Sequence, residues 1–265
     1  MAWDPGLYLR FSDLRMRPAV ELLARVDLES PARIVDLGCG TGTSTTLLRA
    51  RWPEADLEGV DSSAEMLEAA AAGATKARWT RADLASWSPT GPVDLLFANA
   101  SLQWVGDHES LFPRLASRLV LGGVLAVQMP ANHAEPSHAL IREVASTGPW
   151  RERFVGFEPW HPPLSPRRLY ELLAPLALQL DQWDTVYQQV MDGPAAILAW
   201  VRATALRPYL DRLEPEARAA FEGEYLARLT SAYPDLKGGH TPFPFRRRFL
   251  VLKRPGGSQA PLPPG

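Results

Sequence analysis

The sequence predicts an α/β fold: a doubly wound, mostly parallel sheet of seven strands, with a helical insert over the active site. Between residues 33 and 129, strand-like apolar runs alternate with helical patterns, which is typical of parallel sheets. The run 93–98 is almost continuously apolar, as expected of a central strand that is buried on both faces. Two later strand-like runs, at 178–191 and 243–253, complete the predicted sheet.

The individual elements follow from the same patterns. Strands are predicted at 33–37, 56–61, 77–82, 93–98 and 124–129. Helices are predicted at 18–26, from the glycine-rich segment at 38–42 to Trp52, and at 64–72, 111–119, 137–145 and 166–173. Because right-handed crossovers place the carboxyl ends of parallel strands along one edge of a sheet, we expect the binding site at that edge.

The remaining segments are predicted to extend a single domain that spans residues 1–254. Apolar spacing at 3–15 predicts a helix, within an N-terminal segment 1–18 that either forms a lid over the cleft or packs its aromatic face on the core. A helical insert at about 192–240 separates the two late strands and is expected to have no core of its own. Residues 255–265 are rich in proline and glycine, so we expect a disordered tail.

Charge, cysteine content and hydropathy restrict the classes of function. Lysine and arginine (28) nearly balance aspartate and glutamate (30), so nothing favours nucleic acid or an anionic membrane as a partner. Cys39 is the only cysteine, no apolar run approaches 18 residues, and the N-terminus lacks signal-peptide features; a cytoplasmic protein is therefore expected. The five histidines show no metal-ligand spacing, so no metal is expected, and the oligomeric state stays open.

The glycine-rich segment after the first predicted strand indicates a nucleotide site. Gly38, Gly40 and Gly42 stand at alternate positions between an apolar run and a helical pattern. Glycine permits a sharp turn and lets a ligand approach the main chain closely. Asp61 ends the second strand about 20 residues further on, where a carboxylate can bind ribose hydroxyls. The pattern fits either a dinucleotide or S-adenosylmethionine.

Four strings near the carboxyl ends of the predicted strands narrow this choice. They are 36–42 (DLGCGTG), 60–63 (VDSS), 82–84 (ADL) and 97–100 (FANA). Together they resemble the class I S-adenosylmethionine-dependent methyltransferases. The resemblance implies that the cofactor-binding residues are Asp36 at the methionine amine, Gly38, Gly40, Asp61 at the ribose, Ser62, Met66, Asp83 and Leu84 at the adenine, and Asn99. Met66 packs on the adenine in this interpretation, or otherwise in the core of its own helix.

Longer strings extend over nearly the whole chain. They are 3–5 (WDP), 17–22 (RPAVEL), 99–104 (NASLQW), 126–132 (AVQMPAN), 135–138 (EPSH), 206–208 (LRP) and 243–247 (FPFRR). They resemble the trans-aconitate 2-methyltransferases. This resemblance implies methyl transfer from S-adenosylmethionine to a carboxylate of a small polycarboxylic acid, most simply trans-aconitate, giving a monomethyl ester and S-adenosylhomocysteine. No catalytic base is expected, because a carboxylic acid is already ionised at pH 7.

The same resemblance implies a set of substrate-binding residues, each with a structural alternative. They are Tyr8, Gln103, Trp104, His138, Arg207 and Arg247, with Gln103 and Trp104 near the transfer point. Arginine suits carboxylates, but the run 246–248 also fits a solvated strand edge. Trp104 also fits a core aromatic residue, and His138 a helix surface.

Three departures from the family pattern fall on the substrate side, at His133, Gln189 and residues 149–165. Two other functions stay open beside this interpretation. One is an O- or N-methyltransferase of a secondary metabolite, for which His133 or His138 would serve as the base. The other is a dinucleotide-dependent oxidoreductase.

Overall fold

The computed structural model describes residues 16–257 and 261–263, apart from residues 160, 203 and 237. The predicted N-terminal helix at 3–15 lies outside the described residues, and so does Tyr8. The chain divides into two compact units, each built from separate segments. Unit 1 comprises the chain up to Met129, Pro163–Asp184 and the part from Arg248 onward, and unit 2 comprises Pro130–Pro162 and Thr185–Arg247.

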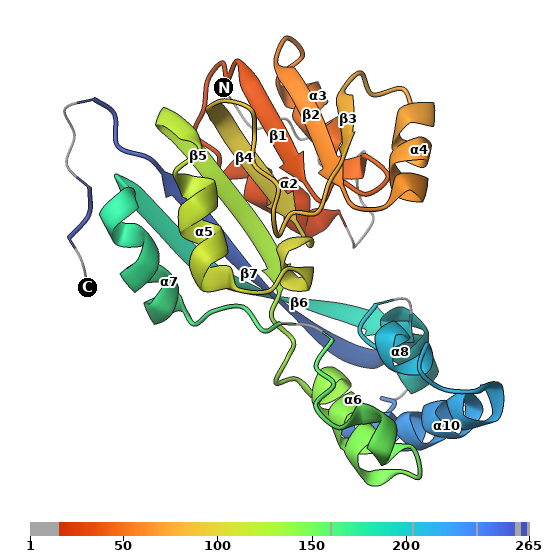
Figure 1. The fold of residues 1–265 in the computed structure, drawn as a ribbon. Helices are drawn as coiled ribbons and strands as arrows, with labels where there is room; N and C mark the ends of the chain where they lie inside the picture. Colours follow the sequence, from red (N-terminus) through yellow and green to blue (C-terminus); the bar gives the residue numbers. More distant parts are fainter. Residues whose placement is uncertain (1–15, 160, 203, 237, 258–260, 264–265) are drawn as a thin grey trace. The chain divides into compact units, whose positions relative to one another are not determined.

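A seven-stranded sheet in the order β3-β2-β1-β4-β5-β7-β6 confirms the predicted fold (Figure 1). The strands are β1 (Arg33–Leu37), β2 (Asp56–Asp61), β3 (Arg78–Arg81), β4 (Val93–Asn99), β5 (Leu119–Pro130), β6 (Gln179–Met191) and β7 (Thr241–Lys253). β1 to β5 pair in parallel. β7 is antiparallel to β5, because Arg254 donates to Gly123 and Ala131 donates to Arg246 at opposite ends of the pair.

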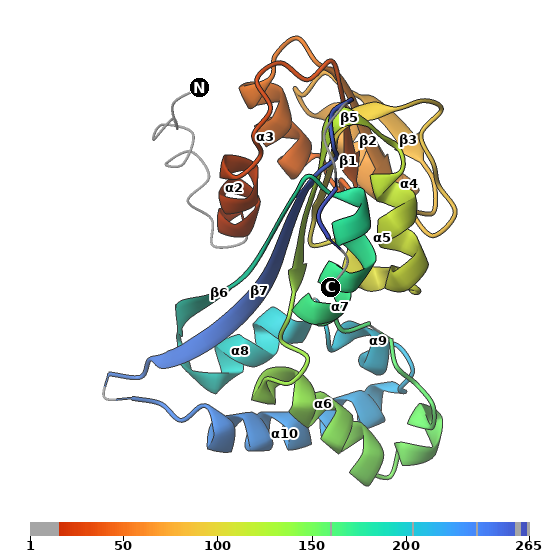
Figure 2. The same ribbon diagram turned by 90° about the vertical axis from the view of Figure 1, so that its left-hand side faces the viewer.

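The helices of unit 1 cover both faces of its part of the sheet. They are α2 (Arg17–Ala24), α3 (Thr43–Arg51), α4 (Ala64–Ala72), α5 (His108–Ala116) and α7 (Pro166–Leu173). Figure 2 shows α2 and α3 on one face and α5 and α7 on the other. Strand residues such as Val35, Leu96 and Leu125 are fully buried in the core between these layers. The helices thus cover the faces of the sheet and leave the ends of its strands uncovered.

Two elements begin three or more residues earlier than the sequence predicts. α5 begins at His108 rather than Leu111, because the Asp107 side chain accepts a hydrogen bond from the Ser110 N–H and caps the helix earlier. β5 begins at Leu119 rather than at the predicted Val124, and it includes Gly122. Gly122 adopts φ +79°, and the register with β4 shifts between Val93 and Leu95, so the strand continues through a bulge.

Unit 2 has its own cluster of buried side chains. Its helices are α6 (Pro136–Thr147), α8 (Gly193–Arg202), α9 (Arg207–Leu210) and α10 (Pro215–Ala232), with a short 3-10 turn at Arg151–Phe154. α6 and α10 lie side by side (Figures 1 and 2). Phe221 and Tyr225 of α10 are fully buried with Ile141 of α6 and Phe243 of β7. The insert thus has a core, which it shares with the helix before it and the strand after it.

Two further observations concern the whole described chain. Among its described residues, no helix is long and apolar enough to cross a membrane. In the tail, Leu262 donates its N–H to the Ala177 carbonyl at 2.7 Å, and Tyr170 donates to the Pro263 carbonyl. The predicted disorder of residues 255–265 stays a prediction.

Candidate functional site

The glycine-rich loop after β1 lies at the carboxyl edge of the sheet in unit 1. Gly38, Gly40 and Gly42 all have positive φ, at +69°, +54° and +81°. A Cβ on Gly38 would lie 2.2 Å from the Cβ of Ser101, whereas one on Gly40 would meet nothing within 4 Å. Gly38 is therefore required for packing. Gly40 instead presents open main chain, as a ligand site needs.

Asp61 at the end of β2 holds this loop in place. Its Oδ2 accepts a hydrogen bond from the Gly40 N–H at 2.9 Å, and its Oδ1 accepts one from the Ser63 N–H at 2.9 Å. Each carboxylate oxygen can accept a second hydrogen bond. The arrangement therefore leaves Asp61 able to accept from ribose hydroxyls beside the open main chain of Gly40.

Asp36 lies beneath the loop and is fully buried. Its Oδ2 accepts hydrogen bonds from Ser44 Oγ at 2.7 Å and Thr45 Oγ1 at 2.6 Å, both in the first turn of α3. Burial, with a smaller contribution from the charge of Asp61, raises the pKa of Asp36 to about 6 despite these bonds. Its Oδ1 has no hydrogen-bond partner in the described part of the chain. An orphaned buried acceptor beside an open glycine loop fits a cationic donor such as the methionine ammonium of S-adenosylmethionine.

The residues expected at the adenine lie on the segments that follow β2 and β3. Met66 is 43 % exposed in the first turn of α4, so it is not a residue of its helix core. Ser62 is exposed beside it, while Ser63 caps the helix by accepting from the Met66 N–H. After β3, Asp83 is exposed and Leu84 is buried. Asp83 Oδ1 accepts from the Ala85 N–H at 2.9 Å, which leaves Oδ2 available.

The segment after β4 forms the neighbouring part of the same edge. Asn99 Oδ1 accepts a hydrogen bond from Gln128 Nε2 at 3.0 Å. Ala100 then adopts φ +54°, and its carbonyl accepts from Gln103 Nε2 at 2.7 Å. Trp104 is 49 % exposed, which excludes the alternative that it is a core residue. A backbone conformation as strained as that of Ala100 is often found at functional sites.

Sequence reasoning missed Ser101, although it stands within the quoted string at 99–104. Its Oγ donates to the Leu37 carbonyl at 2.6 Å, and its Cβ fills the space opposite Gly38. The side chain thereby joins the end of β1 to the end of β4. No sequence pattern signals this contact, because it joins residues that are 64 positions apart.

Unit 2 contains a separate group of buried polar side chains. These side chains are Asn132, Ser137, His138, Gln189, Thr241 and Arg247. Arg247 is 8 % exposed, and its guanidinium lies over the Phe245 ring at 4.3 Å. Burial lowers the pKa of Arg247 to about 10, against an opposing contribution from Tyr187. A bound carboxylate would stabilise the charged form of this arginine.

His138 lies in this group and is uncharged at neutral pH. Burial, with the nearby charges of Arg142, His133 and Arg247, lowers its pKa to about 3. Its Nδ1 lies 3.0 Å from Ser137 Oγ. Burial also lowers the pKa of His133. A general base works best when its pKa lies near the working pH, so His138 is not suited to deprotonate a hydroxyl.

The other predicted arginines differ from Arg247 in their surroundings. The Arg207 side chain is 72 % exposed and lies 3.7 Å from Asp211. Arg246 is paired with Glu135 at 3.4 Å, and Arg248, in unit 1, with Asp184 at 2.9 Å. In the run 246–248, burial of Arg247 therefore excludes a solvated edge for that residue.

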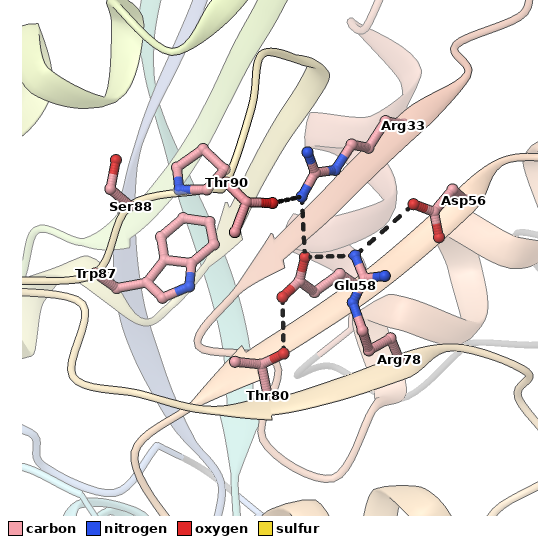
Figure 3. Close-up of a pocket in the computed structure, with 9 residues that line it drawn as sticks. Arg33, Asp56, Glu58, Arg78, Thr80, Trp87, Ser88 and Thr90 are labelled. Carbon is pink, nitrogen blue, oxygen red and sulfur yellow. Dashed lines mark hydrogen bonds and ion pairs between the residues drawn. The ribbon is translucent and has the colours of Figure 1, made fainter.

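A cavity of about 580 Å³ lies at the opposite, amino edge of the strands in unit 1 (Figure 3). Figure 3 shows Glu58 between the guanidinium groups of Arg33 and Arg78. Glu58 accepts from Arg78 at 2.8 Å, from Thr80 at 2.7 Å and from Arg33 at 3.5 Å. The Glu58 carboxylate is paired with both arginines, although Arg33 Nε has no partner among the described residues. Ligands of open α/β sheets bind at the carboxyl edge. We therefore assign this network to stability.

Comparisons with known proteins agree with this geometry. A family model described as a methyltransferase domain matches residues 34–123. The trans-aconitate 2-methyltransferase of Azoarcus sp. (strain BH72) is 50 % identical over 252 residues, covering 95 % of this chain and 99 % of that protein. The enzyme of the same name from Methylobacterium radiotolerans is 49 % identical over 260 residues, covering 95 % and 98 %.

Solved structures share the fold at low identity. The YcgJ protein from Bacillus subtilis has a TM-score of 0.58 at 14 % identity, covering 91 % of this chain and 99 % of that one. A Haemonchus contortus phosphoethanolamine N-methyltransferase, solved with S-adenosylhomocysteine, has a TM-score of 0.55 at 14 % identity, covering 90 % and 52 %.

Proposed function

Since this chain belongs to the trans-aconitate 2-methyltransferase family, we propose that it transfers a methyl group from S-adenosylmethionine to a carboxylate of trans-aconitate. The products are a monomethyl ester and S-adenosylhomocysteine. One observation carries the choice of a carboxylate acceptor: Arg247 is a buried cation beside a neutral His138, in a group where Asn132 offers a further donor. Such a set of donors fits an anion with several oxygen atoms.

The chemistry asks for positioning rather than proton transfer. When bound, S-adenosylmethionine supplies an electrophilic methyl group on a sulfonium that leaves as a neutral thioether. In our proposal Arg247 orients an acceptor that is already ionised at pH 7. His138 stays neutral, so it donates or accepts a hydrogen bond without removing a proton. Alignment of the reacting atoms can contribute about 7–11 kcal/mol, which is sufficient without a base.

We assign the cofactor to the glycine loop of unit 1. The Gly40 main chain leaves room for it, Asp61 accepts from the ribose hydroxyls, and Asp36 Oδ1 accepts from the ammonium group. In this assignment Met66 packs on the adenine ring, and Asp83 accepts a hydrogen bond from its edge. Among the described residues, hydrogen bonds reach only Oδ2 of Asp36, which supports a ligand donor at Oδ1.

Gly40→Ala should weaken S-adenosylhomocysteine binding by roughly tenfold or more, because its Cβ would stand in the space where a ligand meets the main chain. The strained φ also destabilises the fold by about 1–2 kcal/mol. Gly122→Ala is the matched control, since it has φ +79°, open space and no link to the loop. Calorimetric titration should give reduced affinity for the first variant alone. Equal affinities would remove Gly40 from the site.

The acceptor is tested with methyl-labelled S-adenosylmethionine and four acids: trans-aconitate, cis-aconitate, citrate and isocitrate. We expect label on trans-aconitate, and we expect mild base to release it, because an ester hydrolyses where an ether or an N-methyl group does not. Base-stable label on a hydroxyl acid would favour O-methylation of a hydroxyl. No transfer to any of the four, with S-adenosylhomocysteine binding intact, would overturn the proposed acceptor.

A further inference from the structure

Asn132 carries a buried hydrogen-bond donor that no described part of the chain uses. The residue follows β5 and is 1 % exposed. Its Oδ1 accepts a hydrogen bond from the Arg246 N–H at 2.6 Å, which fixes the orientation of the amide. Its Nδ2 is buried and has no hydrogen-bond partner among the described residues. Such donors are rare in folded proteins, and a ligand acceptor is one of the few reasons to retain one.

The contacts of Asn132 place it within the buried polar group of unit 2. The Ala131 N–H donates to the Arg246 carbonyl at 2.9 Å, so this stretch lies against β7 next to Arg247. The Asn132 carbonyl accepts from the Glu135 N–H at 2.8 Å, and that turn leads directly into α6 and His138. The charge of Arg247 in turn acts on His138. Asn132 therefore stands between the strand that carries Arg247 and the helix that carries His138.

The charges around Asn132 favour an anion as the missing acceptor. The carboxylate of its turn, Glu135, lies 3.4 Å from Arg246 and is thereby occupied. Arg247 is buried, and His138 offers no negative charge. Amide N–H groups and arginine together form a common binding arrangement for carboxylates.

We propose that Asn132 is a positioning residue whose Nδ2 donates to a carboxylate of the acceptor other than the one that is methylated, the same carboxylate that Arg247 attracts. This inference rests on the proposed function. It limits the substrate class to acids with at least two carboxylates, one held and one methylated. It also makes Asn132 a determinant of which carboxylate receives the methyl group.

The test is Asn132→Asp, which keeps an oxygen for the Arg246 N–H and replaces the donor with a negative charge. Gln188→Glu is the matched control, because it adds the same charge at an exposed position of β6. Steady-state kinetics with trans-aconitate should show KM raised roughly tenfold or more for Asn132→Asp, with a smaller change in kcat. The KM for S-adenosylmethionine should not change, and Gln188→Glu should match the wild type.

A second readout separates positioning from a structural role. Chromatography of the ester products should show one isomer for the wild type and a mixture for Asn132→Asp. Asn132→Ser, which removes the amide donor without adding charge, should show the same mixture and serves if the aspartate variant does not fold. Unchanged KM and a single isomer in a folded variant would overturn this inference alone. If the wild type does not methylate trans-aconitate at all, the proposed function fails and this inference fails with it.

Discussion

Arg247→Met is expected to raise the KM for trans-aconitate roughly 30- to 700-fold, which is about 2–4 kcal/mol. The loss in binding follows because a desolvated cation is the strongest anchor that unit 2 offers to an anion. The melting temperature of the protein without substrate reports separately on the packing of the Arg247 guanidinium against the Phe245 ring. Kinetics and thermal unfolding on the same preparation measure both effects.

Arg202→Met is the matched control for this experiment. Arg202 also lies in unit 2, but its side chain is 56 % exposed and is paired with Glu222. Surface pairs of this kind contribute about 0–1 kcal/mol, so we expect wild-type KM and little change in melting temperature. A wild-type KM for Arg247→Met would show that the buried arginine is structural and that another group binds the acceptor.

Glu58→Gln is expected to reduce the free energy of unfolding by about 1.5–3 kcal/mol, with no direct effect on either substrate. Glu58 is buried and joins Arg78 and Thr80 on β3 to Arg33 on β1, so its loss breaks charge-assisted bonds across three strands. The effect stays below that of a fully buried pair because Arg78 is 52 % exposed and keeps its hydration. Urea unfolding at pH 7 measures the difference.

The stabilisation by Glu58 depends on pH, because only its charged form pairs with the two arginines. Burial raises the pKa of Glu58, but the bonds from Arg78 and Thr80 and the charges of Arg78 and Arg33 together leave it below its usual value of 4.5. The stabilisation is therefore present above pH 4.5 and is lost as the pH falls through the lower folded-state pKa. The wild type should lose its advantage over Glu58→Gln in that range.

Asp56→Asn is the matched control, since Asp56 lies 3.7 Å from Arg78 but is exposed. We expect it to change the free energy of unfolding by less than about 0.5 kcal/mol. If both variants lose equal stability, the effect reflects net charge rather than the buried position of Glu58.

The sheet and its carboxyl edge could be predicted from the sequence because their signals are local. The apolar run that predicts β1 spans only a few residues, and so does the glycine-rich segment between it and the next helical pattern. The observed bounds of β1, β2, α4 and α7 equal the predicted ones. At β5 the prediction was late by five residues, because Gly122 allows a bulge where glycine more often marks a turn.

The features that could not be predicted depend on contacts between distant segments. Arg247 and Arg246 are adjacent and chemically identical, but alternation along β7 buries one and leaves the other half-exposed. Phe243, Phe245 and Phe249 share the face of β7 on which Arg247 lies, but a core seldom accepts a charged residue, so this alternation alone did not predict its burial. Asn132 likewise becomes notable only because the Arg246 N–H, 114 residues away, occupies one end of its amide.

The strand order β5-β7-β6 has a consequence for the synthesis of the chain. β6 ends at Met191 and β7 begins only at Thr241, so β6 leaves the ribosome about 50 residues before the strand that joins it to the sheet. Until then β5 is an edge strand, open to pairing with other chains. Loss of the last 25 residues would remove two strands from the sheet rather than one, because β6 has no other neighbour in it. The strand made last, β7, thus joins the edge strand β6 to the rest of the sheet.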